Sequence, residues 1–134
     1  MVMKPEDFTE QAQEVLGKSQ EIVRRHQHSQ WDVEHILMAL LEQEEGVPAD
    51  ILREIGASIP AMRANLHDLL EGGPKVAYGS SQIYVSPRAQ RVLQRAKTEA
   101  DRLNDDYVGA EHLLVGVVQD IEGDALKVLT DAGV

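Results

Sequence analysis

Residues 32–41 (DVEHILMALL) decide how this chain folds, because a similar segment recurs at residues 109–118 (GAEHLLVGVV). Both segments place a Glu-His pair directly before a run of aliphatic side chains, Glu34-His35 in the first and Glu111-His112 in the second. Two such segments in one short chain indicate an internal repeat, and a repeat sets the architecture before any single motif does.

The offset that relates Glu34 to Glu111 also relates other parts of the chain, without a gap. Gly46 recurs as Gly123, and Gly56 recurs as Gly133. Further identities at this offset join Ala12-Gln13 to Ala89-Gln90, Val15-Leu16 to Val92-Leu93, Leu37 to Leu114 and Leu52 to Leu129. These matches exceed what unrelated sequences show, so the chain is predicted to contain two copies of one unit.

The first two helices of the unit are predicted from their caps and their periodicity. Asp7 has capping-box spacing to Glu10, and an amphipathic run follows to about Arg25. The buried face of this run is marked at helical spacing by Ala12, Val15, Leu16, Ser19, Ile22 and Val23. Asp32 is placed to cap a second helix that extends to about Glu44. The inward positions of this second helix are Ile36, Leu37, Leu40 and Leu41.

Two shorter helices are predicted to complete the unit. Gly46 ends the second helix, and Pro48 suits the first turn of a third helix that ends at Gly56. Ser58 opens a fourth helix, which ends at Gly72.

The segment between the two copies, residues 72–85, is rich in Gly, Ser and Pro, and residues 83–85 (IYV) suit a short extended piece. Ser86 followed by Pro87 is a strong helix start, from which the helical series repeats. The second copy reaches Val134 without a counterpart of the fourth helix. Either the chain is a piece of a longer one, or the second repeat is shorter.

We therefore expect an all-α fold of two tandem, pseudo-twofold-related repeats of about four helices each, the second one truncated. The whole chain, residues 1–134, is expected to form one domain. Its parts are repeat one at residues 7–72, a linker at 73–85 and repeat two at 86–134.

The composition narrows the choice of partners. The net charge of −10 disfavours nucleic acid, because neutralising phosphates requires clustered Lys and Arg. Aromatic residues make up only 4% of the chain, which argues against a stacking platform for single strands. An acidic surface instead favours basic segments of a polypeptide partner.

The cellular setting is also constrained. The chain has no cysteine, so disulfides and thiolate metal sites are excluded. Residues 1–7 (MVMKPED) are too polar and too acidic for a signal peptide, and no run approaches the ~18 apolar residues of a membrane span. We expect a cytoplasmic protein that does not contact membranes.

Residues 12–19 (AQEVLGKS) match a relaxed phosphate-binding loop, which would suggest a small nucleotide-dependent enzyme. The stretch lies inside a predicted helix, where backbone amides are already hydrogen-bonded, and no strand precedes it. Its equivalent, residues 89–96 (AQRVLQRA), has no trace of the motif. We expect no nucleotide binding, no catalytic residues and therefore no loss of binding in Lys18→Ala.

None of the five histidines has the spacing of a zinc-protease helix, so no metal site is predicted from sequence motifs. A site assembled across the fold stays open. His26 and His28 fall in a predicted loop and are expected to be solvated.

The Glu-His pairs, Glu34-His35 and Glu111-His112, fall in the first turn of equivalent helices. A carboxylate there is favoured by the helix dipole, and each histidine could pack with one nitrogen hydrogen-bonded, so a structural role explains both pairs. The functional alternative is two related sites in which the glutamate receives a cation and the helix amides receive an anion.

These segments resemble the N-terminal domain of Clp-type AAA+ unfoldases. The resemblance rests on residues 8–16 (FTEQAQEVL), 32–41, 85–89 (VSPRA) and 107–114 (YVGAEHLL), and it extends over nearly the whole chain from about residue 8. Within the family, Val33 and residues 73–76 (GPKV) resemble the ClpB-type disaggregases. Residues 107–109 (YVG) also resemble the ClpC type.

The resemblance implies a non-catalytic, pseudo-twofold helical domain tethered to AAA+ rings. Such domains bind unfolded or aggregated polypeptides, or adaptor proteins, and pass clients toward the ring pore. The implied client-binding patch is Thr9, Asp105 and Glu111, with apolar contacts from the groove between the repeats. The implied cofactor, ATP, belongs to the AAA+ modules of a hexameric parent, and the domain alone is expected to be monomeric.

A phosphoarginine-reading module of a ClpC-type protease is the alternative. In ClpC-type relatives, the glutamates at Glu34 and Glu111 belong to two sites for phosphorylated arginine, which would include His35 and His112 here. Those relatives have Thr before each glutamate, whereas this chain has Val33 and Ala110. The departure removes a hydroxyl that could hold phosphate.

Overall fold

The computed structural model describes residues 4–73, 84–120 and 123–134. These residues form the α-helices α1 (Glu10–Arg25), α2 (Val33–Glu42), α3 (Val47–Glu54), α4 (Ile59–Glu71), α5 (Pro87–Arg102), α6 (Ala110–Val118) and α7 (Gly123–Asp131). A 3₁₀ turn, η1 (Pro5–Asp7), and the strands β1 (Gln30–Trp31) and β2 (Tyr84–Val85) complete the described elements. The predicted all-α class, with four helices in the first repeat and three in the second, is confirmed. Most of the predicted linker, residues 74–83, lies outside the described residues.

The long first helix of each repeat starts at a hydroxyl cap. Thr9 Oγ1 accepts a hydrogen bond from the backbone N–H of Ala12 at 3.1 Å, and Ser86 Oγ accepts from Ala89 at 2.9 Å. Asp7, predicted to cap α1, belongs instead to η1, where its carboxylate accepts from the Lys4 N–H. The prediction was wrong because the chain makes one additional turn before Thr9 becomes extended.

The two repeats exchange short extended segments. In β1 and β2, which pair in parallel, Trp31 lies opposite Val85, and an isolated parallel bridge joins Phe8 to Val108. Trp31 and Val108 are equivalent positions of the two repeats, as are Phe8 and Val85, so the two pairings are the same contact made twice. The two repeats are therefore joined twice, by equivalent pairs of extended residues.

The backbone repeats even where the side chains differ. Gly56 and Gly133, which follow α3 and α7, both have a φ of +82°, a conformation that favours glycine. Gln27 and Asn104, which follow α1 and α5, have φ values of +58° and +59°. Left-handed residues at equivalent positions show that the two copies share their turns as well as their helices.

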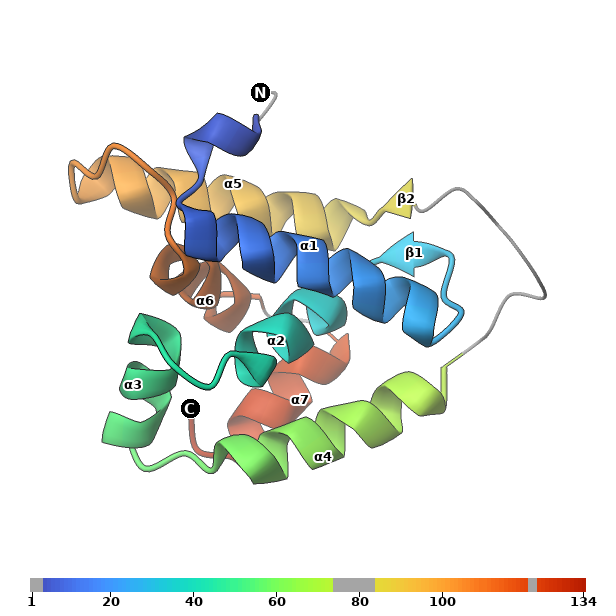
Figure 1. Ribbon diagram of the computed structural model, residues 1–134. Helices are drawn as coiled ribbons and strands as arrows, with labels where there is room; N and C mark the ends of the chain where they lie inside the picture. Colours follow the sequence, from blue (N-terminus) through green and yellow to red (C-terminus); the bar gives the residue numbers. More distant parts are fainter. Residues whose placement is uncertain (1–3, 74–83, 121–122) are drawn as a thin grey trace.

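The core lies around α2 and α6 (Figure 1). α1 packs on α2, α5 packs on α6, and α4 covers α7. Residues 33–41 of α2 are all buried, which explains why the second helix is apolar on nearly every side. α6 approaches α5 closely, since a Cβ added at Gly116 would lie 2.6 Å from the Val92 carbonyl oxygen.

Two sequence motifs are clarified by this packing. The phosphate-loop match at residues 12–19 lies wholly within α1, as predicted. The expectation that His26 is solvated was wrong, because only 1% of this residue is exposed. His26 ends α1 and lies against α4, where its Nδ1 is 2.6 Å from Glu71 Oε1. His28 is partly buried and contacts the Leu70 carbonyl oxygen at 3.0 Å.

Candidate functional site

The histidines of the two Glu-His pairs cap the helices that carry them. His35 Nδ1 accepts a hydrogen bond from the Asp32 N–H at 2.9 Å, and His112 Nδ1 accepts from the Gly109 N–H at 2.8 Å. Because Nδ1 accepts in both rings, a neutral ring carries its proton on Nε2. The predicted hydrogen bond to one ring nitrogen is therefore present in both histidines.

The second nitrogen of each ring has a partner at equivalent positions of the repeat. His35 Nε2 lies 2.8 Å from His28 Nδ1, and His112 Nε2 lies 2.8 Å from Asp105 Oδ2. Burial, helped by the neighbouring His28, lowers the pKa of His35 to about 4. His35 is therefore neutral at physiological pH.

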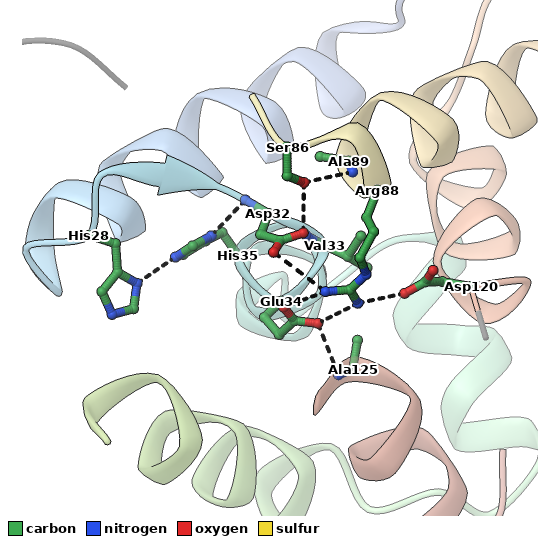
Figure 2. A network of polar contacts seen from close by, with 10 residues as sticks. All are labelled: His28, Asp32, Val33, Glu34, His35, Ser86, Arg88, Ala89, Asp120 and Ala125. Atoms are coloured by element: carbon green, nitrogen blue, oxygen red, sulfur yellow. Dashed lines mark hydrogen bonds and ion pairs between the residues drawn. The ribbon is translucent and has the colours of Figure 1, made fainter. Parts of the chain in front are cut away.

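Glu34 binds an arginine of the other repeat (Figure 2). Arg88, in the first turn of α5, donates from Nη2 to Glu34 Oε2 at 2.9 Å and from Nη1 to Glu34 Oε1 at 3.3 Å. This two-pronged contact is the strong form of the guanidinium-carboxylate interaction. Glu34 Oε2 also accepts from the backbone N–H of Ala125 at 3.1 Å, at the start of α7.

Two further carboxylates surround the same guanidinium. Asp120 Oδ2 accepts from Arg88 Nη2 at 2.6 Å, and Asp32 Oδ2 accepts from Nη1 at 3.4 Å. Burial opposes the charge of Arg88, but the hydrogen bonds that it donates to Glu34 and Asp120 outweigh this effect and hold the pKa of Arg88 above its usual range. We call Asp32, Glu34, Arg88, Asp120 and the Ala125 amide the Glu34 site.

The equivalent positions around Glu111, which we call the Glu111 site, hold no arginine, no aspartate and no residue with a backbone N–H at the position of Ala125. At the offset of the repeat, the positions of Asp32, Arg88, Asp120 and Ala125 are occupied by Gly109, Gln11, Gln43 and Pro48. Glutamine carries no charge, glycine has no side chain, and proline has no N–H to donate. The Glu111 side chain is 38% exposed, against 12% for Glu34, and its Oε1 lies 3.9 Å from His112 Nδ1. Glu34 is therefore occupied from within the molecule, whereas Glu111 is accessible.

The residues of the implied client-binding patch gather where α1 begins and α6 begins. The Thr9 N–H donates to the Val108 carbonyl oxygen at 3.0 Å, which fixes the start of α1 beside the loop between α5 and α6. Asp105 lies in that loop, and Glu111 follows it. Thr9 also caps α1 and Asp105 contacts His112, so both have a structural contact besides any role in binding. Their role as client contacts stays a prediction.

The sequence analysis missed two exposed residues of this region and one residue of the Glu34 site. Leu103 and Tyr107, in and beside the same loop, are 51% and 57% exposed, an unusual position for apolar and aromatic side chains. Arg88 was also missed as a site residue. A position-by-position comparison of the two repeats would have shown that Arg88 is equivalent to Gln11. This difference distinguishes the Glu34 site from the Glu111 site.

A groove lies between the two repeats. Its volume is about 400 Å³, and its walls include Leu16 and Gln20 of α1, Leu93 of α5, and Phe8 and Trp31. Both α1 and α5 line the groove, and the two helices run in opposite directions in Figure 1. Phe8, which lines the groove, directly precedes Thr9 of the polar patch in the sequence.

The comparisons with known proteins agree with this architecture. The family model of the Clp repeat N-terminal domain matches residues 7–132. The chain belongs to this family. It is 36% identical over 127 residues to the chaperone protein ClpB of Oceanobacillus iheyensis. The aligned segment covers 95% of this chain and 15% of that protein. The identity and coverage are the same for ClpC/MecB of Bacillus subtilis, a negative regulator of genetic competence.

Solved structures of Clp N-terminal domains share the fold. The Hsp104 N-terminal domain of Candida albicans has a TM-score of 0.84 and 20% identity, over 95% of this chain and 82% of that one. The N-terminal domain of ClpD from Arabidopsis thaliana has a TM-score of 0.75 and 25% identity, over 98% and 88% of the two chains. The resemblance stated from sequence motifs is confirmed, and the chain spans about a seventh of the curated relatives it matches.

The equal similarity to ClpB and ClpC leaves the choice between these types open. Within the described part of the chain, no helix combines the length and apolar character that crossing a bilayer requires.

Proposed function

We propose that this Clp N-terminal domain binds segments of unfolded or aggregated polypeptides, or of an adaptor protein, in the groove between its repeats. The groove carries the proposal, because its apolar walls come from both repeats, and the same domain exposes the carboxylates of Asp105 and Glu111. Apolar side chains of a client would lie against Leu16 and Leu93. Its Lys or Arg side chains would meet the carboxylates, which suits the net charge of −10.

The parent protein would supply the chemistry. We propose that the domain is not an enzyme, that client binding needs no cofactor in this domain, and that the domain delivers clients to ATP-driven AAA+ rings of a hexamer. Weak binding to many sequences is expected, because a disordered client loses conformational entropy on docking. A cytoplasmic location stays a prediction, since some relatives are chloroplastic.

The proposal is tested by an amide NMR titration with a permanently unfolded, Lys- and Arg-rich polypeptide. Shifts are expected along the groove and at Thr9, Asp105 and Glu111, and they should weaken when the lysines of the polypeptide are acetylated. Leu93→Gln should lower affinity several-fold. The matched control is Ile55→Gln, which changes an apolar residue after α3 that is 54% exposed. Equal losses in both variants, or shifts confined to other surfaces, would overturn the groove as the binding surface.

Arginine recognition at Glu111 is a second candidate function. The Glu34 site shows how a glutamate at this helix position holds a guanidinium, and Glu111 occupies the same position without an internal arginine. An arginine or phosphoarginine side chain of a client is therefore proposed to bind at Glu111 only. Glu111→Gln should abolish binding of free phosphoarginine, while Ala110→Thr should strengthen it by adding the hydroxyl that ClpC-type sites have. If free phosphoarginine binds neither the unaltered chain nor the Ala110→Thr variant, this candidate function is ruled out.

A further inference from the structure

Three potential metal ligands meet at the end of the first repeat. His26 ends α1, while His67 and Glu71 lie on one face of α4, one helical turn apart. One ligand atom from each residue lies within 4.8 Å of the other two. The grouping joins side chains of two helices that are far apart in the sequence, which is why no spacing motif revealed it.

His26 is the unusual member of the cluster. Only 1% of the residue is exposed, and its Nε2 has no hydrogen-bond partner among the described residues, while its Nδ1 faces the Glu71 carboxylate. Its Nδ1 lies 2.6 Å from Glu71 Oε1, and its ring centre lies 5.4 Å from that of His67. Leaving a buried polar atom unsatisfied costs roughly 1–3 kcal/mol, so a buried imidazole that faces an acid and a second imidazole requires an explanation.

The donor set suits one class of metal. Two imidazoles and one carboxylate are ligands that Zn²⁺ takes together, at bond lengths of about 2.0–2.2 Å, with a fourth position left for water. Such a tetrahedral site places its ligand atoms roughly 3.3 Å apart. His67 and Glu71 are exposed, so their side chains are able to adjust around the buried His26 ring: the 2.6 Å distance from His26 Nδ1 to Glu71 Oε1 would open, and the longer distances, up to 4.8 Å, would shorten to that spacing.

We propose that His26, His67 and Glu71 form a Zn²⁺ site that ties the end of α1 to the last turns of α4. α4 packs on α2 and also covers α7 of the second repeat, so the metal would fix a helix on which both repeats depend. The site belongs to the first repeat alone, because the position equivalent to His26 in the second repeat is Leu103. None of the three ligands lines the groove, and the zinc proposal does not depend on the proposed client binding.

Isothermal titration of the untagged chain with ZnCl₂ tests the proposal, with thermal unfolding as a second readout. One ion per chain is expected to bind, and saturating Zn²⁺ is expected to raise the melting temperature. His67→Ala and Glu71→Gln should each weaken Zn²⁺ binding at least tenfold, roughly the effect of losing one ligand. Both residues are exposed, so circular dichroism should show that both variants still fold.

Asp68→Asn is the matched control, because it removes a carboxylate beside His67 from the same helix. This variant should bind Zn²⁺ as the parent chain does, and MgCl₂ should produce no binding, since Mg²⁺ prefers oxygen ligands. Absence of Zn²⁺ binding would overturn the proposal. Binding that persists unchanged in His67→Ala and Glu71→Gln would also overturn it, because the ion would then lie elsewhere.

Discussion

Glu34 and Glu111 occupy the same position of the repeat, in the first turn of α2 and of α6, yet their surroundings differ. Glu34 is held by Arg88 and by the Ala125 amide, and two aspartates complete the site. Glu111 has a glycine, two glutamines and a proline at the equivalent positions, and more than a third of its side chain is exposed. The Glu34 site is an ion-pair contact between the two repeats, whereas the Glu111 site is exposed and has no internal arginine.

The comparison shows how a duplicated fold separates stability from binding. The helices, the caps and the exchanged extended residues are common to both repeats, because both must bury the same apolar faces. Asp32, Arg88 and Asp120, and the residues equivalent to them around Glu111, are not part of the apolar core, so they are able to differ. A carboxylate that is already paired is a poor receptor for a cationic client, which leaves Glu111 as the receptor to test.

Removing the internal arginine is expected to have the largest effect. In Arg88→Ala, three carboxylates remain close together without a cation, and the Asp120 side chain is only 3% exposed. Breaking a buried ion pair costs about 3–5 kcal/mol, so urea unfolding should show a loss of this order. Gln11→Ala, at the equivalent position of the first repeat, should change stability by less than about 1 kcal/mol. Equal losses in the two variants would mean that the sites do not differ energetically.

The pH dependence of stability sharpens the comparison at His35. Its pKa is lowered to about 4 in the folded state, so the stability it contributes is fully present above about pH 6.5. That contribution is lost as the pH falls from about 6.5 through about 4, by at most roughly 3 kcal/mol. Urea unfolding in EDTA at several pH values measures the slope, and His35→Gln should flatten it. A slope that is unchanged in this variant would assign the effect to other groups.

Adding an arginine beside Glu111 should make the Glu111 site resemble the Glu34 site. Gln11→Arg places a guanidinium at the position equivalent to Arg88, where it should pair with Glu111. Affinity for an arginine-rich peptide is then expected to fall about fivefold, a loss of roughly 1 kcal/mol. Gln11→Met, which keeps the length without the charge, is the matched control and should retain binding. A peptide affinity that is unaffected by Gln11→Arg would exclude Glu111 as a contact.

The smallest expected effect is that of salt on binding at the exposed carboxylates. Affinity for the same peptide should fall about twofold between roughly 50 and roughly 200 mM NaCl, because few exposed charges take part and they are screened. Stability of the Glu34 site should change less over this range, since its charges are mostly buried. Fluorescence anisotropy measures the first quantity and urea unfolding the second. Affinity that does not depend on salt would show that apolar contacts alone hold the peptide.

Much of the molecule followed from local sequence rules. The caps at Asp32, Ser58 and Ser86 were predicted and are present, because a short side chain bonds to backbone amides close to it in the sequence. Asp7 was the exception, since a 3₁₀ turn used it before the helix began. The burial of His26 was not predicted either, because it depends on α4, a helix distant in the sequence that crosses the end of α1.

The sequence by itself determined the two repeats, their helices and the equivalent placement of Glu34 and Glu111, because periodicity, caps and a constant offset are local properties of the chain. Only the tertiary structure decided which glutamate is paired. Arg88 is 54 residues from Glu34, and the Ala125 amide is 91 residues from it, so their meeting depends on how the repeats pack. The His26, His67 and Glu71 cluster has the same origin, since side chains far apart in sequence meet only after burial of the core brings their helices together.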